Sequence, residues 1–385
     1  MTAISITALA LVLIAWIGYP IAATLLAWLL RSRSRSAAPP TAGSVSVVLA
    51  TRHAPGVVAA RVRDLLSTGY PRGLLEIIVA VDAAATYGLA DYAALLPAGV
   101  RVVAGDPPGG KAVTLNAAVR AATSDIVVFA DSAQRFDAAT IPAFVQFLAH
   151  EEFGAVSGAY RIGPETTGSV LRAFWGLETV IRRAEARLHS LVAVTGAIYA
   201  IRRRLWRPLP AGLICDDLYV PLQVAATGLR VGFCETALAS DDRTFDHRQE
   251  FARKVRTLTG LLQVCRWFPW VLAPWRNPVW LQFVCHKLLR LATPYLLVIA
   301  LVGAAPVWAG WAAALWPAAA VLVALATMAA VARPVQTQRI LAKATWAIWL
   351  QGAAIVATLN GLRGRWDVWQ HVPPSPKPSL TIVRA

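Results

Sequence analysis

The chain has 385 residues, of which 57% are hydrophobic and only 15% are charged. Soluble domains average about 25% charged residues, so the composition excludes an ordinary soluble domain and predicts that part of the chain lies in lipid. The net charge of +16 predicts contact with membrane lipids and phosphorylated substrates, with no nucleic acid partner, because the arginines flank apolar spans. The four cysteines lack CxxC spacing, which predicts free thiols rather than a zinc site or disulfides.

The first apolar stretch runs from Ile4 to Leu30 and is long enough to cross a bilayer, which takes about 20 residues. Its length, and the lack of a basic segment before it, disfavour a cleaved signal peptide. Three arginines follow at once, and the positive-inside rule then places the next domain in the cytoplasm. We therefore expect an N-terminal transmembrane helix over residues 1–30 and a basic linker over residues 31–43.

From Ser44 onward, short apolar runs alternate with helical stretches. The runs that predict strands are 45–50, 75–82, 100–104, 126–130, 155–162 and 194–201, and the helical stretches include 111–122 and 141–150. This alternation predicts an α/β domain over residues 44–250, with a mostly parallel sheet covered on both faces. Ligands bind beyond the carboxyl ends of such strands, where Asp82 and Asp131 lie.

Beyond about Phe251 the chain becomes basic, amphipathic and aromatic, which predicts interfacial helices over residues 251–285. Three apolar stretches follow, near 288–305, 310–332 and 344–361. We expect about three transmembrane helices within residues 286–362, flanked by interfacial tryptophans, and a tail over residues 363–385. The sequence leaves open how many of these stretches cross the membrane and on which side the tail ends.

Short polar motifs follow the predicted strands in a fixed order. The strands end at Thr51-Arg52-His53-Ala54, at Asp82-Ala83-Ala84 and at Asp131-Ser132-Ala133, and Gly109-Gly110-Lys111 precedes Leu115-Asn116. Glycines let the backbone approach a nucleotide, and a lysine beside them supplies a cation for its phosphates.

A carboxylate pair, Asp216-Asp217, comes later, followed by the basic cluster Arg253-Lys254-Val255-Arg256. Such a carboxylate can take a proton from an acceptor hydroxyl, and its neighbour can raise its proton affinity by like-charge repulsion. The alternative is structural: an aspartate before Leu218 would be a good N-cap for a helix.

Taken in order, these motifs resemble those of membrane-bound bacterial glycosyltransferases of family 2, which include cellulose and hyaluronan synthases. The resemblance implies a GT-A (Rossmann-like) α/β domain in the cytoplasm, on a multi-pass protein of the bacterial inner membrane. It implies inverting transfer of a sugar from a nucleotide donor, a UDP-sugar, to a membrane-delivered acceptor that is lipid-linked or a glycan. The product would belong to polysaccharide or glycolipid synthesis.

The resemblance also assigns roles to single residues. It implies that Asp217 is the catalytic base, that Asp216 supports it, and that Arg256 stabilises the departing diphosphate. Asp82 corresponds to the residue that reads uracil, and Asp131 to the one that contacts the ribose. The substrate-binding residues that it implies are Thr51, Asp82, Gly110, Lys111, Asn116, Asp131 and Arg253.

Several positions depart from the family pattern. The family's Asn-Glu is His53-Ala54 here, and the usual Gly-Ser after Asp82 is Ala83-Ala84. Ala133 replaces the usual second ligand of a Mg²⁺ or Mn²⁺ ion, whose ligands are oxygens. We therefore expect Asp131 to hold this metal with waters and phosphates alone, Gln134 to help, or arginines to do more of the work. The departures keep an alternative open, a catalytically reduced scaffold subunit of a polysaccharide assembly complex.

A literal QxxRW motif, which polymerising relatives carry, stands at residues 263–267. In the family, however, this motif precedes a Gly-x-x-Gln step, and Gly260 and Gln263 supply that step here. The counterpart is then the segment 253–257, with Arg256 as the arginine and Thr257 in place of tryptophan. Because that tryptophan resembles an acceptor platform, its replacement predicts non-processive transfer.

Overall fold

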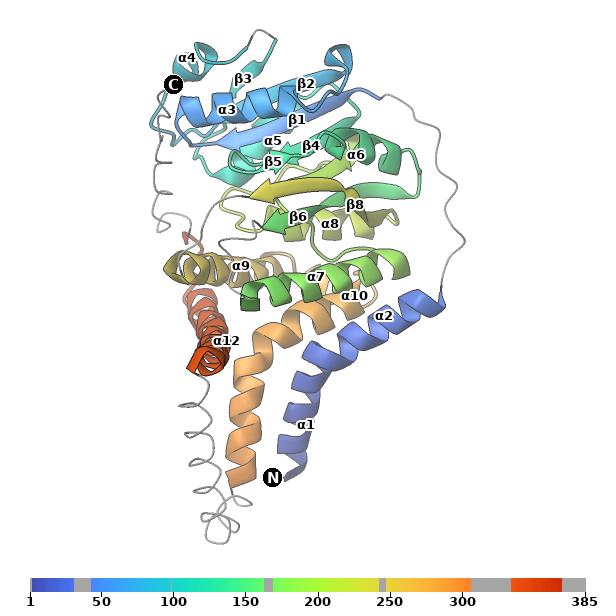
Figure 1. Ribbon diagram of the computed structural model, residues 1–385, viewed down its shortest axis with the longest axis vertical. Coiled ribbons are helices and arrows are strands. Elements are labelled where there is room, and N and C mark those ends of the chain that lie inside the picture. Colours follow the sequence, from blue (N-terminus) through green and yellow to red (C-terminus); the bar gives the residue numbers. More distant parts are fainter. Residues whose placement is uncertain are drawn as a thin grey trace.

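The computed structural model describes residues 2–30, 43–97, 99–162, 169–241, 247–305 and 334–368. Figure 1 shows an α/β domain at one end and helices that extend away from it toward the other end. The apolar stretch at 310–332 and most of the predicted linker at 31–43 lie outside the described residues.

A mixed eight-stranded sheet forms the centre of the α/β domain, in the order β3-β2-β1-β4-β7-β6-β8-β5. Its strands are β1 (Val45–Thr51), β2 (Leu75–Val81), β3 (Arg101–Ala104), β4 (Ile126–Ala130), β5 (Arg135–Phe136), β6 (Phe153–Ile162), β7 (Ile198–Arg202) and β8 (Arg230–Asp241). Strands β3, β2, β1 and β4 run parallel, as predicted. The expectation of a mostly parallel sheet is too simple, because β7 is antiparallel to both β4 and β6.

The alternation of side chains along β1 builds a hydrophobic core on each face of the sheet. Val48 packs with Leu115 and Phe129 in one core, whereas Val47 and Leu49 belong to the other. Successive residues of a strand point to opposite faces, so a strand covered on both faces must be apolar throughout. Because β1 is parallel to both β2 and β4, the carboxyl ends of these strands lie at the same edge of the sheet, beside the start of the helix that follows β3.

The helices of the α/β domain complete both layers. They are α3 (Pro55–Leu66), α4 (Leu89–Ala93), α5 (Lys111–Ala121), α6 (Thr140–Leu148) and α8 (Asp216–Ala226), with short 3₁₀ turns at Arg72–Leu74 and Arg203–Leu205. Periodicity predicted α5 and α6 to within two residues at each end. The sequence did not predict β5 or β8, and it started β7 four residues early.

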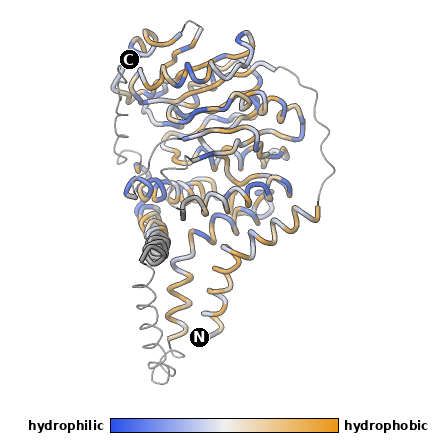
Figure 2. The backbone as a smooth tube through the Cα atoms, in the orientation of Figure 1, coloured by the Kyte–Doolittle hydropathy of each residue, from blue (hydrophilic) through white to orange (hydrophobic). Residues whose placement is uncertain are grey.

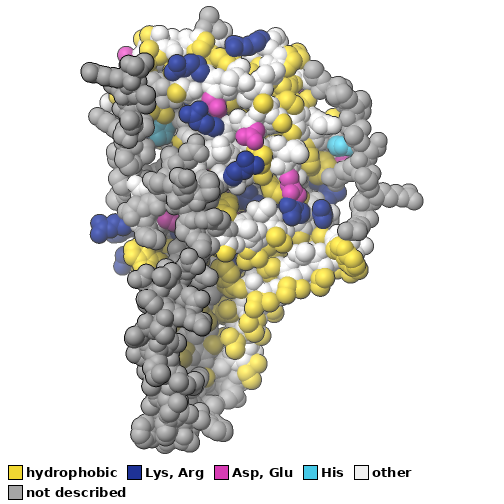
Figure 3. All heavy atoms as spheres, viewed as in Figure 1, with side chains coloured by type: hydrophobic (Ala, Val, Ile, Leu, Met, Phe, Trp, Pro, Cys, Tyr) yellow, Lys and Arg dark blue, Asp and Glu magenta, His cyan; other side chains and the backbone are white. Residues whose placement is uncertain are grey.

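Within the described ranges, two helices are long and apolar enough to cross a membrane, Ala3–Leu29 and Trp280–Ala305. Each contains a π-helical turn, at Ile14–Gly18 between α1 (Thr2–Leu13) and α2 (Tyr19–Leu29), and at Phe283–Leu288 after α10 (Trp280–Gln282). A third helix, α12 (Pro334–Leu362), carries a shorter apolar stretch. Figures 2 and 3 show that hydrophobic residues predominate on the helices that extend from the domain.

Two amphipathic helices lie between these apolar helices and the sheet. Helix α7 (Ser169–Leu188) packs against α2, and α9 (His247–Trp267) packs against α12 and is followed by a 3₁₀ turn at Pro269–Leu272 (Figure 1). The rings of Phe251 and Trp349 join α9 to α12 edge to face, 5.3 Å apart. Arg182 of α7 bonds Thr195, and Gln263 of α9 bonds Ile214, so both helices connect the predicted membrane region with loops of the α/β domain.

Candidate active site

Asp82, at the end of β2, fixes the glycine loop that precedes α5. Its carboxylate accepts hydrogen bonds from the backbone N–H groups of Ala84 and Gly110, both at 2.8 Å, and pairs with Arg52 Nε at 3.0 Å. Gly109 and Gly110 have φ of 90° and 103°, and a Cβ on Gly109 would lie 2.7 Å from Asp82 Oδ1. Only glycine allows this close approach, so Asp82 and the glycine pair together set where α5 begins.

Lys111, the first residue of α5, lies at the centre of the acidic residues. Its Nζ is 3.4 Å from Asp216 Oδ1 and 3.6 Å from Asp131 Oδ1. Burial opposes the charge of this ammonium, but Asp131, Asp216 and Asp217 outweigh it and raise the pKa of Lys111 above its ordinary value. The side chain is therefore a permanent cation at the carboxyl edge of the parallel strands.

Asp216 and Asp217 open helix α8. The N-cap position is Cys215, which makes no side-chain capping bond, so neither aspartate acts as the N-cap that the structural alternative required. Asp216 is buried, and its Oδ2 has no hydrogen-bond partner among the described residues. Burial, followed by the charge of Asp216, raises the pKa of Asp217 to about 6, against the opposing charges of Lys111, Arg256 and Arg182.

Gly196 borders the space between Asp217 and Lys111. A Cβ at this position would lie 3.5 Å from both Asp217 Oδ2 and Lys111 Nζ. The neighbouring Val194 donates its N–H to the Asp217 carbonyl at 2.9 Å, which ties this loop to the start of α8. No role for Gly196 follows from the sequence, where it is a glycine within the predicted strand 194–201.

Helix α9 holds the loop that leads into the two aspartates. The buried amide of Gln263 accepts from the Ile214 N–H and donates to the Gly212 carbonyl, both at 2.9 Å. Gly260 lies so close to Cys215 that any Cβ would collide with its Sγ. One turn earlier on α9, the charge of Arg256 lowers the pKa of Asp217, which shows that Arg256 lies within electrostatic reach of it. The Gly-x-x-Gln step is thus a positioning device for the loop before Asp216.

Arg266, the arginine of the literal QxxRW, is exposed on the same helix. Its neighbour Trp267 packs beside Gly212 and contacts the Trp366 ring edge to face, with centroids 6.4 Å apart. Arg256, rather than the exposed Arg266, is therefore the arginine of α9 whose charge acts on Asp217.

Three of the predicted substrate-binding residues have partners within the protein. Thr51 Oγ1 accepts from the His53 N–H at 3.0 Å and from Ser132 Oγ at 3.2 Å. The amide of Asn116 both donates to and accepts from the Leu209 backbone at 2.8 Å, and Arg253 bonds both oxygens of Glu250 at 2.9 Å. These contacts favour supporting roles, and binding of substrate by these residues stays a prediction.

Asp131 provides one carboxylate for a divalent metal. Its side chain is 40% exposed, Ala133 offers no side-chain ligand, and Gln134 donates its amide to Asp241 at 3.0 Å. Within the described part of the chain, no three His, Cys, Asp or Glu side chains gather to hold a metal. This donor set fits only an ion whose other ligands are diphosphate oxygens and waters, which is a common arrangement for Mg²⁺.

The sequence model of glycosyltransferase-like family 2 matches residues 40–260. The chain belongs to this family. It is therefore a glycosyltransferase, with the GT-A-like α/β fold that the sheet order displays. No curated protein sequence matches the chain.

A solved structure extends the likeness in fold beyond the residues that the family model matches. The mannosyltransferase PcManGT from Pyrobaculum calidifontis, in complex with GDP-Man and Mn²⁺, is 24% identical with a TM-score of 0.68, over 94% of this chain and 99% of that one. Glucosyl-3-phosphoglycerate synthase from Mycobacterium tuberculosis, in complex with Mn²⁺, UDP and its product, is 20% identical with a TM-score of 0.41, over 58% and 79%. The first likeness includes the helices outside the α/β domain.

Proposed function

We propose that this family 2 glycosyltransferase transfers one sugar, with inversion, from a nucleotide sugar to an acceptor delivered by the membrane. The observation that carries the proposal is the constellation around Asp217, which is partly accessible, has a pKa of about 6, and has Lys111 and Arg256 within electrostatic reach. A base, a buried neighbouring carboxylate and two cations are what displacement of a diphosphate from an anomeric carbon requires.

In the proposed reaction Asp217 accepts the proton of the acceptor hydroxyl while that oxygen attacks the anomeric carbon. The bond to the diphosphate breaks on the opposite face, so the configuration inverts. A general base is most effective when its pKa lies close to the working pH, and a value of about 6 leaves Asp217 ionised near pH 7. Asp216, buried and beside Lys111, contributes to that value through its charge.

Lys111 and Arg256 would stabilise the negative charge that develops on the departing nucleoside diphosphate. Such preorganised charges are often the largest catalytic term, because they need no reorganisation during the reaction. A bound Mg²⁺ or Mn²⁺, held by Asp131 and the diphosphate, would add Lewis-acid stabilisation of the same oxygens. The manganese in the solved mannosyltransferase supports this use of metal.

Two observations bear on which nucleobase the nucleotide sugar carries. The resemblance of Asp82 to a uracil-reading residue favours a UDP-sugar, whereas the similar PcManGT holds GDP-Man. Three protein donors already occupy the Asp82 carboxylate, so its contribution to base selection has to be measured.

The membrane part of the proposal rests on the apolar helices. Two candidate spans, the arginines after the first of them, and the interfacial helices α7 and α9 support a multi-pass protein of the bacterial inner membrane with its catalytic domain in the cytoplasm. The acceptor would then be a lipid-linked sugar or a glycan, in polysaccharide or glycolipid synthesis. Thr257, in the place of an acceptor-stacking tryptophan, supports a non-processive enzyme.

The test is a donor panel on the purified full chain in detergent. Release of nucleoside diphosphate and thermal stabilisation are measured with UDP- and GDP-sugars, with and without Mn²⁺. We expect one nucleotide class to stabilise the protein and to be slowly hydrolysed, because a ligand that binds only the folded state raises its melting temperature. Failure of every nucleotide sugar to bind or react would favour the scaffold alternative.

A further inference from the structure

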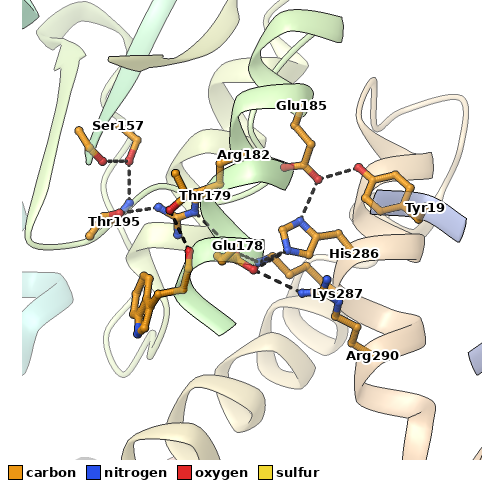
Figure 4. Close-up of polar contacts among 12 residues, drawn as sticks. Tyr19, Ser157, Glu178, Thr179, Arg182, Glu185, Thr195, His286, Lys287 and Arg290 are labelled. Atoms are coloured by element: carbon orange, nitrogen blue, oxygen red, sulfur yellow. Dashed lines mark hydrogen bonds and ion pairs between the residues drawn. The ribbon is translucent and has the colours of Figure 1, made fainter. Parts of the chain in front are cut away.

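A second charged cluster lies outside the catalytic centre, at the junction of α7 with the two apolar helices (Figure 4). Glu178 of α7 is within 3.5 Å of four cationic or potentially cationic side chains, Arg182, His286, Lys287 and Arg290. His286 also bonds Glu185 at 2.8 Å through its other ring nitrogen, and Tyr19 of α2 donates to the same carboxylate at 2.7 Å. Side chains of α7, α2 and the apolar helix Trp280–Ala305 therefore meet in one polar cluster.

The charges of this cluster do not balance. Glu178 and Glu185 are the only carboxylates among its described members, and they face three permanent cations besides His286. The ring nitrogens of His286 contact both carboxylates, at 2.8 Å for Glu185 and 3.0 Å for Glu178, and Nε2 also lies 3.4 Å from Lys287 Nζ. Uncompensated buried charge is costly, and removing it from water is favourable only when a counterion is present.

Several donors in the cluster are also unused. The Nε and Nη2 of Arg290, whose guanidinium lies over the Trp16 ring at 4.8 Å, are buried without hydrogen-bond partners within the described part of the chain, and Arg182 Nε makes only its 3.5 Å ion pair with Glu178. Buried guanidinium nitrogens are rarely left in this state, and they are suited to bind the oxygens of a phosphate. The donors left unused and the excess of positive charge point to the same missing partner, an anion.

Lys254 of α9 adds a further cation on the side facing α7. Its Nζ lies over the Phe174 ring at 4.3 Å and has no ion pair or hydrogen bond among the residues that the structure describes. Burial, followed by the charge of Arg253, lowers the pKa of Lys254 to about 8, and Lys287 contributes to this effect while Glu250 and Glu178 oppose it. The ammonium therefore senses the charges of the cluster, and its contact with the Phe174 ring ties it to α7.

The cluster lies between the catalytic base and an apolar groove. On one side, Arg182 donates to Thr195 Oγ1 at 2.5 Å, next to Gly196, and its charge reaches Asp217 (Figure 4). On the other side, the apolar helix that carries His286 and Arg290 also lines an apolar groove, which begins one turn after Arg290. The groove is lined by Pro294, Tyr295, Val298, Ile299 and Ile355. A ligand with a polar head and an apolar tail could therefore bind with its head in the cluster and its tail in the groove.

We propose that Lys254, Arg182, Lys287 and Arg290 form a binding site for the phosphate group of an acceptor lipid, whose hydrocarbon chain lies in the apolar groove. This inference rests on the proposed function and names the class of its acceptor. The phosphate supplies the missing negative charge and acceptors, and Arg182 connects the bound head to the loop beside Asp217. The phosphate source is a membrane lipid, because Lys287 and Arg290 lie on the candidate membrane span Trp280–Ala305.

The test uses the full chain in detergent and compares four probes. Farnesyl phosphate carries the proposed head and a short tail, farnesol lacks the phosphate, inorganic phosphate lacks the tail, and phosphatidylglycerol is an anionic lipid without a terminal phosphate. We expect farnesyl phosphate to raise the melting temperature most. Equal stabilisation by phosphatidylglycerol, or stabilisation by farnesol without its phosphate, would overturn the proposal.

Lys254→Gln is the decisive variant, and the exposed Arg266→Gln on the same helix is its control. Lys254→Gln should bind farnesyl phosphate about 10–100-fold more weakly, because a hydrogen bond to a charged group is lost. Without ligand it should be at least as stable as the wild type, since the substitution removes a half-buried charge that has no carboxylate partner among the described residues. A merely structural lysine would instead give a less stable variant with unchanged affinity, and that result contradicts the proposal.

Donor hydrolysis separates this inference from the proposed function. If the wild type hydrolyses a nucleotide sugar but farnesyl phosphate neither binds nor increases turnover, the lipid-phosphate site is wrong and the glycosyltransferase mechanism stands. If no nucleotide sugar is bound or hydrolysed, the proposed function itself fails, whatever the lipid does.

Discussion

The ammonium of Lys111 lies 3.4 Å from Oδ1 of Asp216 and joins the first residue of α5 to the first residue of α8. This contact places the glycine loop, which is predicted to bind the donor, next to the acidic pair Asp216 and Asp217. It also gives Asp216 a permanent counterion within a buried setting. Asp217 next to it therefore senses a negative neighbour and a positive one, and their balance sets its proton affinity.

The dependence of activity on pH should report this balance. Asp217 must be ionised to accept a proton, so kcat/KM should fall about tenfold per pH unit as the pH drops below about 6. Asp216→Asn removes a charge that raises the pKa of Asp217, so the acidic limb should move to lower pH. Asp106→Asn, at a half-buried carboxylate that pairs with Arg120 and not with the acidic pair, should leave it unchanged. An acidic limb that stays in place in Asp216→Asn would mean that another group controls it.

The close contact between Gly260 and Cys215 should limit which residue can stand at 260. Gly260→Ala forces a methyl group onto the Cys215 sulfur, and overpacking of this kind costs about 1–3 kcal/mol of unfolding free energy. Thermal unfolding should show the loss, and Cys215→Ala in the same chain should recover part of it. Gly56→Ala, where the added Cβ meets nothing within 4 Å, is the matched control. Equal stabilities of Gly260→Ala and Gly56→Ala would contradict the packing described here.

Asp82 should contribute to donor binding chiefly through the glycine loop. Asp82→Ala removes the anchor of the Gly110 N–H and the partner of Arg52, at a cost of about 1.5–3 kcal/mol for a charged hydrogen bond. We expect it to weaken uridine and guanosine diphosphates alike in equilibrium binding. Selective loss of uridine nucleotides would show instead that the carboxylate reads the base.

Arg256 and Arg266 distinguish the two possible basic motifs. Arg256 lies within electrostatic reach of Asp217, whereas Arg266 is exposed. Arg256→Gln should lower kcat by about 10²–10³-fold, because it would stabilise charge that develops only in the transition state. Arg266→Gln should retain activity. The reverse pattern would make residues 263–267 the working motif and would favour processive synthesis.

Periodicity in the sequence predicted the elements that are regular by themselves. Strands β1, β2 and β4 are continuous apolar runs, and α5 follows a recognisable glycine turn, so their places could be read directly. Strand β8 could not, because Gly232, Glu235 and Thr236 interrupt its apolar pattern and its pairing with β6 shifts register. Local patterns carry no information about such long-range pairing.

The same distinction between local sequence patterns and long-range contacts applies to the candidate site. Order along the chain indicated Asp217 and Lys111 as functional residues, but it could not show that Asn116 bonds Leu209, 93 residues away, or that Gln263 holds Ile214, 49 residues away. The cluster around Glu178 was also missed, because its members come from three helices that meet only in the folded chain. Contacts of this kind depend on tertiary packing.

The most direct test of the central claim is the Asp217→Asn variant of the full chain, assayed with its best nucleotide sugar and a lipid acceptor. The amide keeps the shape of the side chain but cannot take the hydroxyl proton, so transfer should fall about 10²–10⁴-fold while donor affinity is retained. Asp106→Asn, prepared in parallel, should transfer sugar at the wild-type rate. Transfer by Asp217→Asn at a rate close to that of the wild type would show that Asp217 is not the base and would contradict the mechanism.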